Sequence, residues 1–251
     1  LNNYPGFRAA GTPNEIGNSF KNHVMENLRW LYNQVAPEIR ERSKLWYDGA
    51  RKITDDFVNQ YQLHSNEVHP NSSAAAIAVL SPQKDWFQNV SLAERVHYIH
   101  YTKKDFKWSP EMDRVAKKIY ARPDYQKDLL AIKGKKYKEL EDPYEKAMWL
   151  RTYDEAHNPK DFHVISPEGN KMELVRNELK KGQTEATPSR VAWGSNNEIA
   201  KAIQALEANG DMAKISPLLG EQHKVRSFYN NIVAPNSTRG DVTIDTHAVA
   251  A

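Results

Sequence analysis

The chain has 251 residues, of which 39% are hydrophobic and 27% are charged, and its formal net charge is +3. This length suffices for one good-sized domain or two small ones with a hydrophobic core. We see neither a membrane span nor a secretory signal in the sequence. The absence of cysteine excludes disulfides, zinc–thiolate sites and cysteine-ligated iron–sulfur clusters. The mildly basic charge permits an anionic partner without requiring one.

Residues 1–18 are rich in glycine and proline and are predicted to form an irregular arm. Ser19 then provides a candidate helix cap, and apolar residues recur at mostly helical spacing from there to residue 64. We expect these helices to pack on the core and their aromatic residues to be part of it. These aromatic residues include Trp30, Trp46 and Tyr47.

Residues 74–80 form a continuous apolar run, which is typical of a buried helix. His97 and His100 follow as an H-x-x-H pair. A helical pair of histidines without a third ligand in register is weak evidence for a metal. We therefore predict no metal site.

Residues 101–189 are the most basic part of the chain, and aromatic residues are interleaved with the cations, as in many nucleic-acid surfaces. The alternative is a solvated helical face, because acidic residues dilute the charge. Near the end of this segment, DFHVISPEGNKMELV alternates around an EG turn and predicts a small β-hairpin. The cations include Lys103, Lys104, Lys107, Arg114, Lys117, Lys118, Lys127, Lys133, Lys135, Lys136 and Lys138, and the interleaved aromatic residues include Trp108, Tyr120, Tyr125 and Tyr137.

A capping box at Ser195 and Glu198 predicts a helix that ends at Asn209-Gly210. The segment 211–249 then reads as a short helix, a tight turn at Gly220 and a longer amphipathic helix. The apolar stripe of the longer helix consists of Val225, Phe228, Tyr229, Ile232 and Val233.

Two residues of this segment have the right positions for chemistry. Lys224 lies in the first turn of the longer helix, where the positive end of the helix dipole favours a neutral amine. A neutral amine is a nucleophile. Asp245 stands at an expected N-cap, where backbone N–H groups would keep its carboxylate ionised.

Two motifs resemble those of the helix-hairpin-helix DNA glycosylases, the superfamily of endonuclease III and 8-oxoguanine glycosylase. The first is LLGEQHK, followed by an apolar helix and IDTH. The second is residues 76–96, which resemble the first core helix of that family and the loop after it, with the triplet Ser81, Pro82 and Gln83. Together the similar segments cover roughly a third of the chain. Gln222 stands where the family has a second glycine, and the distance from Lys224 to Asp245 is longer, as in a divergent, phage-type member.

The resemblance implies an all-α, mainly helical fold of the helix-hairpin-helix glycosylase type. Residues 65–100 and 190–251 would form its core, and the helices of 19–64 would pack beside it. Residues 101–189 would be a basic insertion, an appendage to the core that carries the small β-hairpin. It also implies DNA as the partner. We expect no cofactor, no iron–sulfur cluster, no membrane partner, a monomer and a cytoplasmic location.

The implied function is a DNA N-glycosylase that excises a damaged or modified base after base flipping, with a lysine-dependent lyase step. Asp245 would stabilise the charge that develops on the sugar, and Lys224 would form a Schiff base. Two alternatives stay open: an enzyme on the same fold that modifies a pyrimidine in DNA without excising it, and a DNA-binding module without chemistry.

The resemblance also assigns binding residues. Gln83 would fill the space of the extruded base, although a helix-end cap or an exposed polar residue explains it equally well. Asp85 and Trp86 would line the base pocket, and Trp86 is an equally good core residue. The residues expected to contact the DNA backbone are Lys214, Leu219, Gly220, Gln222 and His223.

Overall fold

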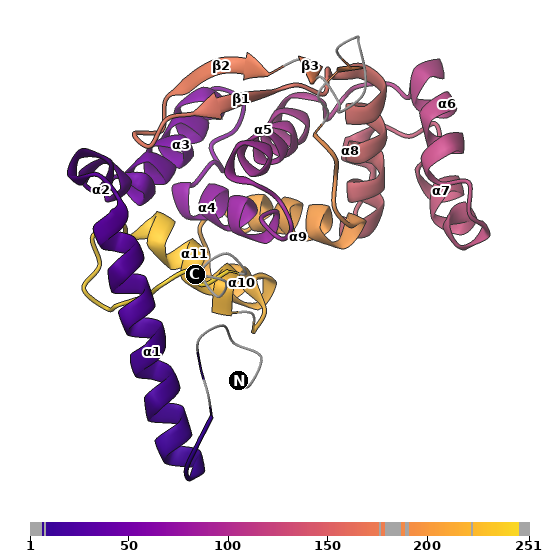
Figure 1. Ribbon diagram of the computed structural model, residues 1–251. Helices are drawn as coiled ribbons and strands as arrows, with labels where there is room; N and C mark the ends of the chain where they lie inside the picture. The colour runs from indigo at the N-terminus through magenta and orange to yellow at the C-terminus, as the bar shows by residue number, and fades with distance from the viewer. Residues whose placement is uncertain are drawn as a thin grey trace. The chain divides into compact units, whose positions relative to one another are not determined.

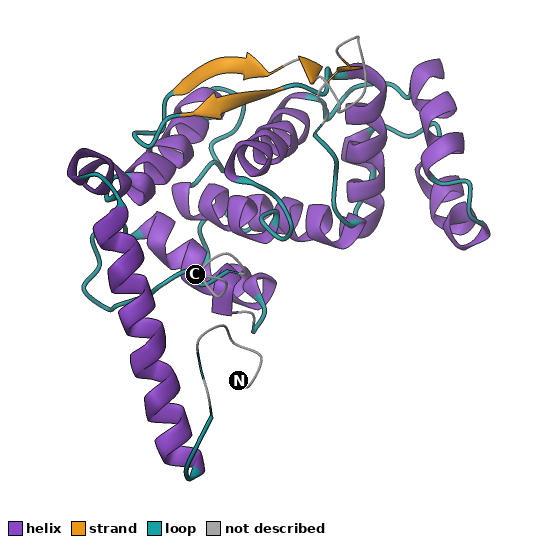
Figure 2. Ribbon diagram, viewed as in Figure 1, coloured by secondary structure: helices purple, strands orange, loops and turns teal. Residues whose placement is uncertain are grey.

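The computed structural model describes residues 7, 9–175, 177–178, 187–188, 191–221 and 223–245. The protein is mainly helical and carries small antiparallel β-structure, which confirms the predicted fold class (Figures 1 and 2). Two compact units are present, one formed by residues 1–45 and 244–251 and the other by residues 46–243. Among the described helices, none has the length and apolar content that a membrane span requires.

The first unit contains α1 (Pro13–Gln34) and α2 (Pro37–Ser43). α1 begins before the predicted position because Thr12 caps it: the Glu15 N–H donates to the Thr12 hydroxyl, and the Glu15 carboxylate accepts the Thr12 N–H at 2.7 Å. The prediction of an irregular arm up to residue 18 is therefore wrong from Pro13 onward. The prediction that Trp30 packs in the core is also wrong, since its side chain is 62% exposed.

The second unit is built around α4 (Pro70–Val79), whose residues from Ser72 onward are all buried. α4 packs against α3 (Trp46–Tyr61), α5 (Trp86–Thr102) and α9 (Asn196–Glu207) (Figure 1). A helix that is apolar on every side must be enclosed on every side, and this one is. Of the helices predicted over 19–64, only α3 belongs to this core.

Residues 101–189 contribute to the same core. They contain α6 (Pro110–Ile119), η1 (Pro123–Tyr125), α7 (Gln126–Ile132), η2 (Tyr137–Glu139) and α8 (Pro143–His157). α8 packs along α9 and buries Met148, Trp149 and Leu150 completely. The prediction that this segment is an appendage is therefore wrong, because α8 supplies one side of the core.

Half of the cations of residues 101–138 form ion pairs with acidic neighbours. Asp113 accepts ion pairs from Lys117 at 3.0 Å and Lys133 at 3.1 Å, and Asp105 pairs with Lys138. Two of the interleaved aromatic residues, Tyr120 and Tyr137, are buried. These contacts favour the interpretation of this segment as a solvated helical face over that of a nucleic-acid surface.

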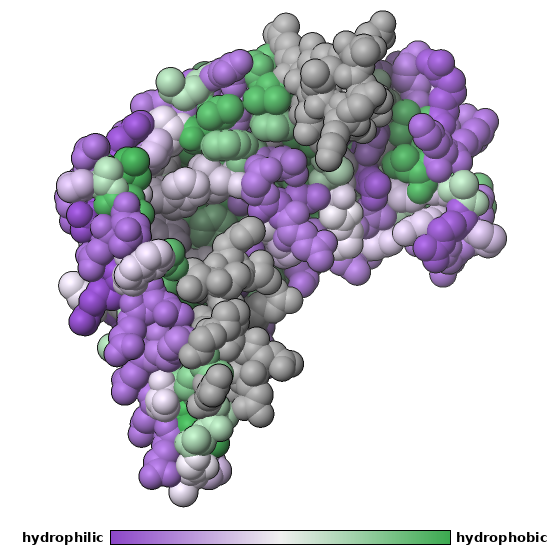
Figure 3. Space-filling view, in the orientation of Figure 1, coloured by the Kyte–Doolittle hydropathy of each residue, from purple (hydrophilic) through white to green (hydrophobic). Residues whose placement is uncertain are grey.

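The predicted β-hairpin is present as β1 (Phe162–Ile165) and β2 (Lys171–Val175), with Phe162 opposite Val175; β3 (Asn177–Glu178) and β4 (Thr187–Pro188) form a second short pair. Hydrophobic side chains gather over the β1–β2 hairpin (Figure 3). Its turn lies so close to Gly49 of α3 that a Cβ there would approach the Pro167 carbonyl oxygen to 2.1 Å. Glycine is thus required at this contact.

A buried ion pair joins α5 to α8. The guanidinium of Arg95 donates to the Asp154 carboxylate at 2.9 Å, and both residues are almost fully buried. The Trp193 indole N–H donates to the other carboxylate oxygen at 3.0 Å, and Arg95 also donates to the Asp161 carbonyl oxygen at 2.9 Å. Each buried charge is therefore paired and hydrogen-bonded, as burial demands.

The two histidines of the H-x-x-H pair are buried in α5 and have separate partners. The ring of His97 lies 2.8 Å from the Ser73 hydroxyl, and that of His100 lies 2.8 Å from the Tyr137 hydroxyl. Burial lowers the pKa of His97 to about 4 and that of His100 to about 3. Both rings are therefore neutral hydrogen-bonding groups of the core.

Candidate functional site

The helix hairpin begins where α9 ends. Ser195 caps α9 by accepting the Glu198 N–H at 3.2 Å, which confirms the predicted N-cap. The chain then turns through Asn209 and Gly210, both at positive φ, and the Gly210 N–H donates to the Ser72 hydroxyl of α4 at 2.8 Å. This bond attaches the start of the hairpin to the central helix.

The hairpin consists of α10 (Met212–Leu219) and α11 (His223–Val233), joined by a short turn. Gly220 has φ +63°, as expected for the glycine of this turn. Arg226 then reaches back from α11: its guanidinium donates to the carbonyl oxygens of Gly220 and Ser216, the latter at 2.9 Å. A cation on the last carbonyls of a helix stabilises its end.

The role of Arg226 was not predicted from the sequence. This side chain holds the turn in which the glycosylase superfamily has a second glycine and this chain has none. Gln222, which stands in that place, lies outside the described residues. The turn is held by a side chain from the following helix, with a further bond from the Tyr229 hydroxyl to the Met212 sulfur at 2.9 Å. In the sequence, the only sign of this role is a single arginine among the apolar residues of α11.

The apolar stripe of α11 is confirmed, since Val225, Phe228, Tyr229 and Ile232 are buried. This stripe packs on α4 and α3 and so fixes the rotation of α11. Lys224, the second residue of α11, is partly buried, and His223 before it is exposed. The first N–H groups of a helix have no partner within it, so the end of α11 that carries Lys224 is suited to anions.

Two of the residues predicted to contact the DNA backbone, Leu219 and Gly220, already have contacts within the protein. The Leu219 side chain is buried and packs in the core. The Gly220 N–H donates to the Pro217 carbonyl oxygen at 3.2 Å and is used by the helix end. Lys214 is exposed on α10. The surface of the hairpin that remains for a ligand is therefore the start of α11 and the exposed side of α10.

The turn between α4 and α5 has an unusual backbone. The Lys84 N–H donates to the Ser81 carbonyl oxygen at 3.1 Å, which closes the turn. Within it, Gln83 is exposed and has φ +58°. A non-glycine residue in the left-handed region is strained, and such strain persists only where the surroundings enforce it.

Asp85 and Trp86 have structural roles next to this turn. Asp85 caps α5, because its carboxylate accepts the Gln88 N–H at 2.9 Å. Trp86 is partly buried, and its ring centroid lies 5.6 Å from that of Trp46 and 6.0 Å from that of Phe228. The contact with Phe228 brings the α4–α5 turn beside α11.

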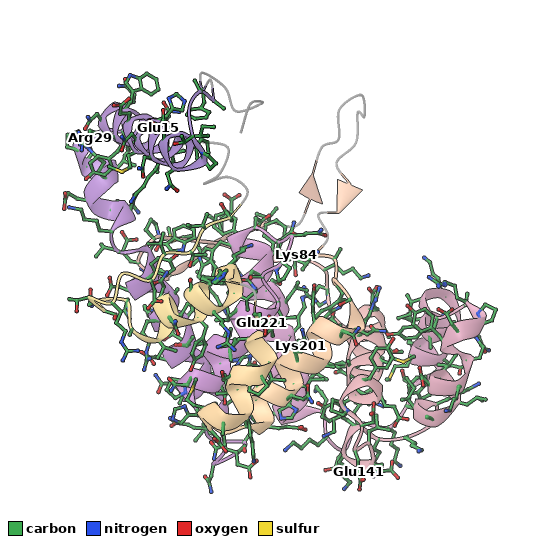
Figure 4. The ribbon with its side chains drawn as sticks, turned by 90° about the horizontal axis from the view of Figure 1, so that it is seen from below. Glu15, Arg29, Lys84, Glu141, Lys201 and Glu221 are labelled. Carbon is green, nitrogen blue, oxygen red and sulfur yellow. The ribbon has the colours of Figure 1, made fainter. Side chains whose placement is uncertain are left out.

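Positive charge collects around these two turns. Lys84 of the first turn and Lys201 of α9 are labelled in Figure 4. Both lysines act on the carboxyl group of Glu198. Burial nevertheless raises the pKa of Glu198, against the effect of the Ser195 N–H and the two lysines. No ion pair within the described part of the chain involves Lys84, Lys201, Lys214 or Lys224, in contrast to Lys117, Lys133 and Lys138.

Asp245 belongs to the unit formed by residues 1–45 and 244–251, and Lys224 to the other unit. Asp245 is partly buried and ends the described part of the chain. The helix that it was predicted to cap would start at residue 246 and lies outside the described residues. Across the described ranges, no group of three or more His, Asp or Glu side chains is arranged to hold a metal ion.

Comparison with known proteins gives one match. No curated protein and no solved structure matches the chain. Residues 12–140, slightly more than half of the chain, match a family of unknown function, DUF7178. The matched segment runs from the cap of α1 to the end of η2, so it includes the strained turn at Gln83 but not the helix hairpin. The chain therefore belongs to the DUF7178 family of unknown function.

Proposed function

We propose that this protein is a DNA glycosylase, which flips a damaged or modified base out of the helix and releases it. The observation that carries the proposal is the meeting of two segments far apart in sequence. The α4–α5 turn with Gln83 and the helix hairpin with Lys224 are both anchored on α4, and Trp86 and Phe228 join them. These are the two segments that resemble the glycosylase superfamily.

The hairpin side supplies contacts for a DNA backbone. The lysines available near the hairpin and the α4–α5 turn are Lys84, Lys201, Lys214 and Lys224. Lysines neutralise phosphates without reading sequence, and the N–H groups at the start of α11 bind a phosphate in the same manner. Such contacts position a duplex and leave recognition to the base itself.

Gln83 supplies the group that replaces the flipped base. Its backbone strain holds an exposed, hydrogen-bonding side chain at the tip of a short turn. Because the side chain is exposed, packing does not compensate for the backbone strain. Strain of this kind points to a function for the residue. Inserted into the duplex, an amide of this size would fill the vacated space and contact the orphaned partner base.

Lys224 supplies the nucleophile. Its amine attacks C1′ of the sugar, a C–N bond forms, and the glycosidic bond breaks with its electron pair leaving on the base. Loss of a proton from the attacking nitrogen and opening of the sugar ring give the Schiff base. Elimination of the 3′ phosphate from this imine would cleave the strand.

Asp245 is the carboxylate of the proposal. Positive charge develops on the sugar as the base departs, and a carboxylate can stabilise it. Asp245 lies in the other unit, so its contribution is tested separately from that of Lys224.

Borohydride trapping tests the nucleophile directly. The full chain is incubated with a duplex containing one abasic site, and the imine is reduced to a stable adduct that is resolved by mass. We expect an adduct that Lys224→Gln abolishes and that Lys214→Gln, the matched control on α10, retains. Persistence of the adduct in Lys224→Gln would place the nucleophile elsewhere. Absence of any adduct with binding retained would favour base modification or binding alone.

A further inference from the structure

The C-terminal half of α1 exposes a continuous apolar stripe. Leu28 and Leu31 are 44% and 37% exposed, and Val24 extends the stripe by one turn toward the N-terminus. Val35, the C-cap residue that follows the helix, is 38% exposed and ends the stripe. The spacing of these residues by four, three and four positions is that of the a and d positions in a coiled coil. No residue of α1 is buried. A stripe with this spacing is normally covered by another helix.

The positions that flank this stripe carry no charge. Met25 and Tyr32, which are 50% and 51% exposed, lie on one side of it, and Asn27 and Gln34 lie on the other. Two identical helices can therefore approach along the stripe without repulsion between like charges. Lys21 occupies the next position of the repeat and ends the stripe toward the N-terminus.

The net charge of α1 limits the kinds of partner that can cover the stripe. The charged residues of α1 are two acidic and two basic ones, Glu15, Lys21, Glu26 and Arg29, two of which are labelled in Figure 4. Nucleic acids and anionic lipid surfaces both select helices with an excess of Lys and Arg. A helix with no net charge and an uncharged apolar stripe fits another uncharged, apolar protein surface. The same stripe on a second copy of the chain is the simplest such surface.

We propose that α1 pairs with α1 of a second copy of the chain in antiparallel orientation, in place of the monomer that we expected from the sequence. In this arrangement Leu28 faces the partner's Leu31, and Val24 faces the partner's Val35. The contact is isologous, so each residue pair occurs twice. Met25 lies beside the partner's Tyr32, a favourable contact between a thioether and an aromatic ring.

Two helices paired over three turns bury an area at the low end of stable interfaces, which lie above roughly 1,000 Å². The pairing is therefore a weak dimer that forms at micromolar concentration. The family match begins at the cap of α1, so this helix is part of the segment that defines the family. The inference does not depend on the glycosylase proposal.

The absence of cysteine allows a direct test of the register. Leu28→Cys and Leu31→Cys variants of the full chain are mixed and oxidised, and each disulfide-linked pair is identified by mass spectrometry of the linked tryptic peptides, because Arg29 separates the two positions. Opposed positions lie within the short range that a disulfide requires. We expect the mixed pair to cross-link several-fold faster than Glu26→Cys, an exposed control on the outer side of the helix. Equal rates for the mixed pair and the control would overturn the register.

Sedimentation over a concentration series tests the dimer itself. Leu31→Glu should make the protein monomeric with unchanged helix content, because Leu31 is exposed in the single copy. A Leu28→Lys and Leu31→Glu double variant should dimerise again, since opposite charges then face each other. A wild-type chain that stays monomeric at hundreds of micromolar would overturn the proposal. Binding of that monomer to anionic lipid vesicles would assign the stripe to a membrane surface instead.

Discussion

Replacing Gln83 by glycine is expected to stabilise the protein while impairing its action on DNA. Gln83 has φ +58°, and a left-handed conformation costs a non-glycine residue about 1–2 kcal/mol. Glycine avoids this cost but loses about 0.5–1 kcal/mol to the greater entropy of its unfolded chain. Because the Gln83 side chain is exposed, its removal costs little else. The net gain should be about 0.5–1 kcal/mol.

Thermal unfolding monitored by circular dichroism measures this gain, which corresponds to a rise in Tm of about 2–3 °C for a domain of this size. Gln83→Ala keeps the strained backbone and should show no gain, yet both variants should bind a duplex with an abasic site more weakly. Asn209→Gly, at the other non-glycine position with positive φ, is the control that should leave DNA affinity unchanged. A Gln83→Gly variant that is no more stable than the wild type would refute the argument from strain.

Three further predictions concern the core. The pKa of His97 is lowered to about 4 and that of His100 to about 3, so the stabilisation from their neutral rings is fully present above pH 6.5 and is lost as pH falls toward these values. Urea unfolding should therefore give a free energy of unfolding about 3 kcal/mol lower at pH 5.5 than at pH 7.5. A free energy that does not change with pH would contradict the burial of neutral rings. Asp154→Ala leaves the Arg95 guanidinium buried without a counter-charge and should cost about 3–5 kcal/mol in the same assay, whereas a loss below 1 kcal/mol would mean that water reaches the pair. Gly49→Ala forces a Cβ into the backbone of the hairpin turn and should lower the free energy of unfolding by about 1–3 kcal/mol; an unchanged value would show that the turn moves away freely.

Local patterns in the sequence were sufficient for several elements. The stripe of α11 and the helix after Ser195 were predictable because their burial follows a single periodicity. The hairpin around Gly169 was predictable because alternation and a turn residue coincide there. In each case one short segment contains all the information that decides its structure.

Contacts between distant segments were not predictable in the same way. Residues 101–189 were expected to be an appendage because their charge is visible in the sequence, whereas the packing of α8 along α9 is not. Asp85 was expected in a base pocket, but a residue before a helix is at least as well suited to cap it. The role of Arg226 depends on the fold of the turn six residues before it.

The exposure of the apolar stripe of α1 has a different cause. Apolar residues at helical spacing predict that a face is covered, but not by what. Within α1 that face is open in the single chain. A partner copy would explain the pattern without a contribution from the core, which is why composition and periodicity alone led to the wrong expectation.

The most direct test of the central claim is the release of free base. The full chain is incubated with duplex and single-stranded DNAs that carry oxidised, alkylated, deaminated or hypermodified bases, and the products are identified by mass spectrometry, with Asp245→Asn alongside. The proposal predicts free base from at least one of these DNAs and its disappearance in the variant. Retained DNA binding with no free base from any substrate would contradict it.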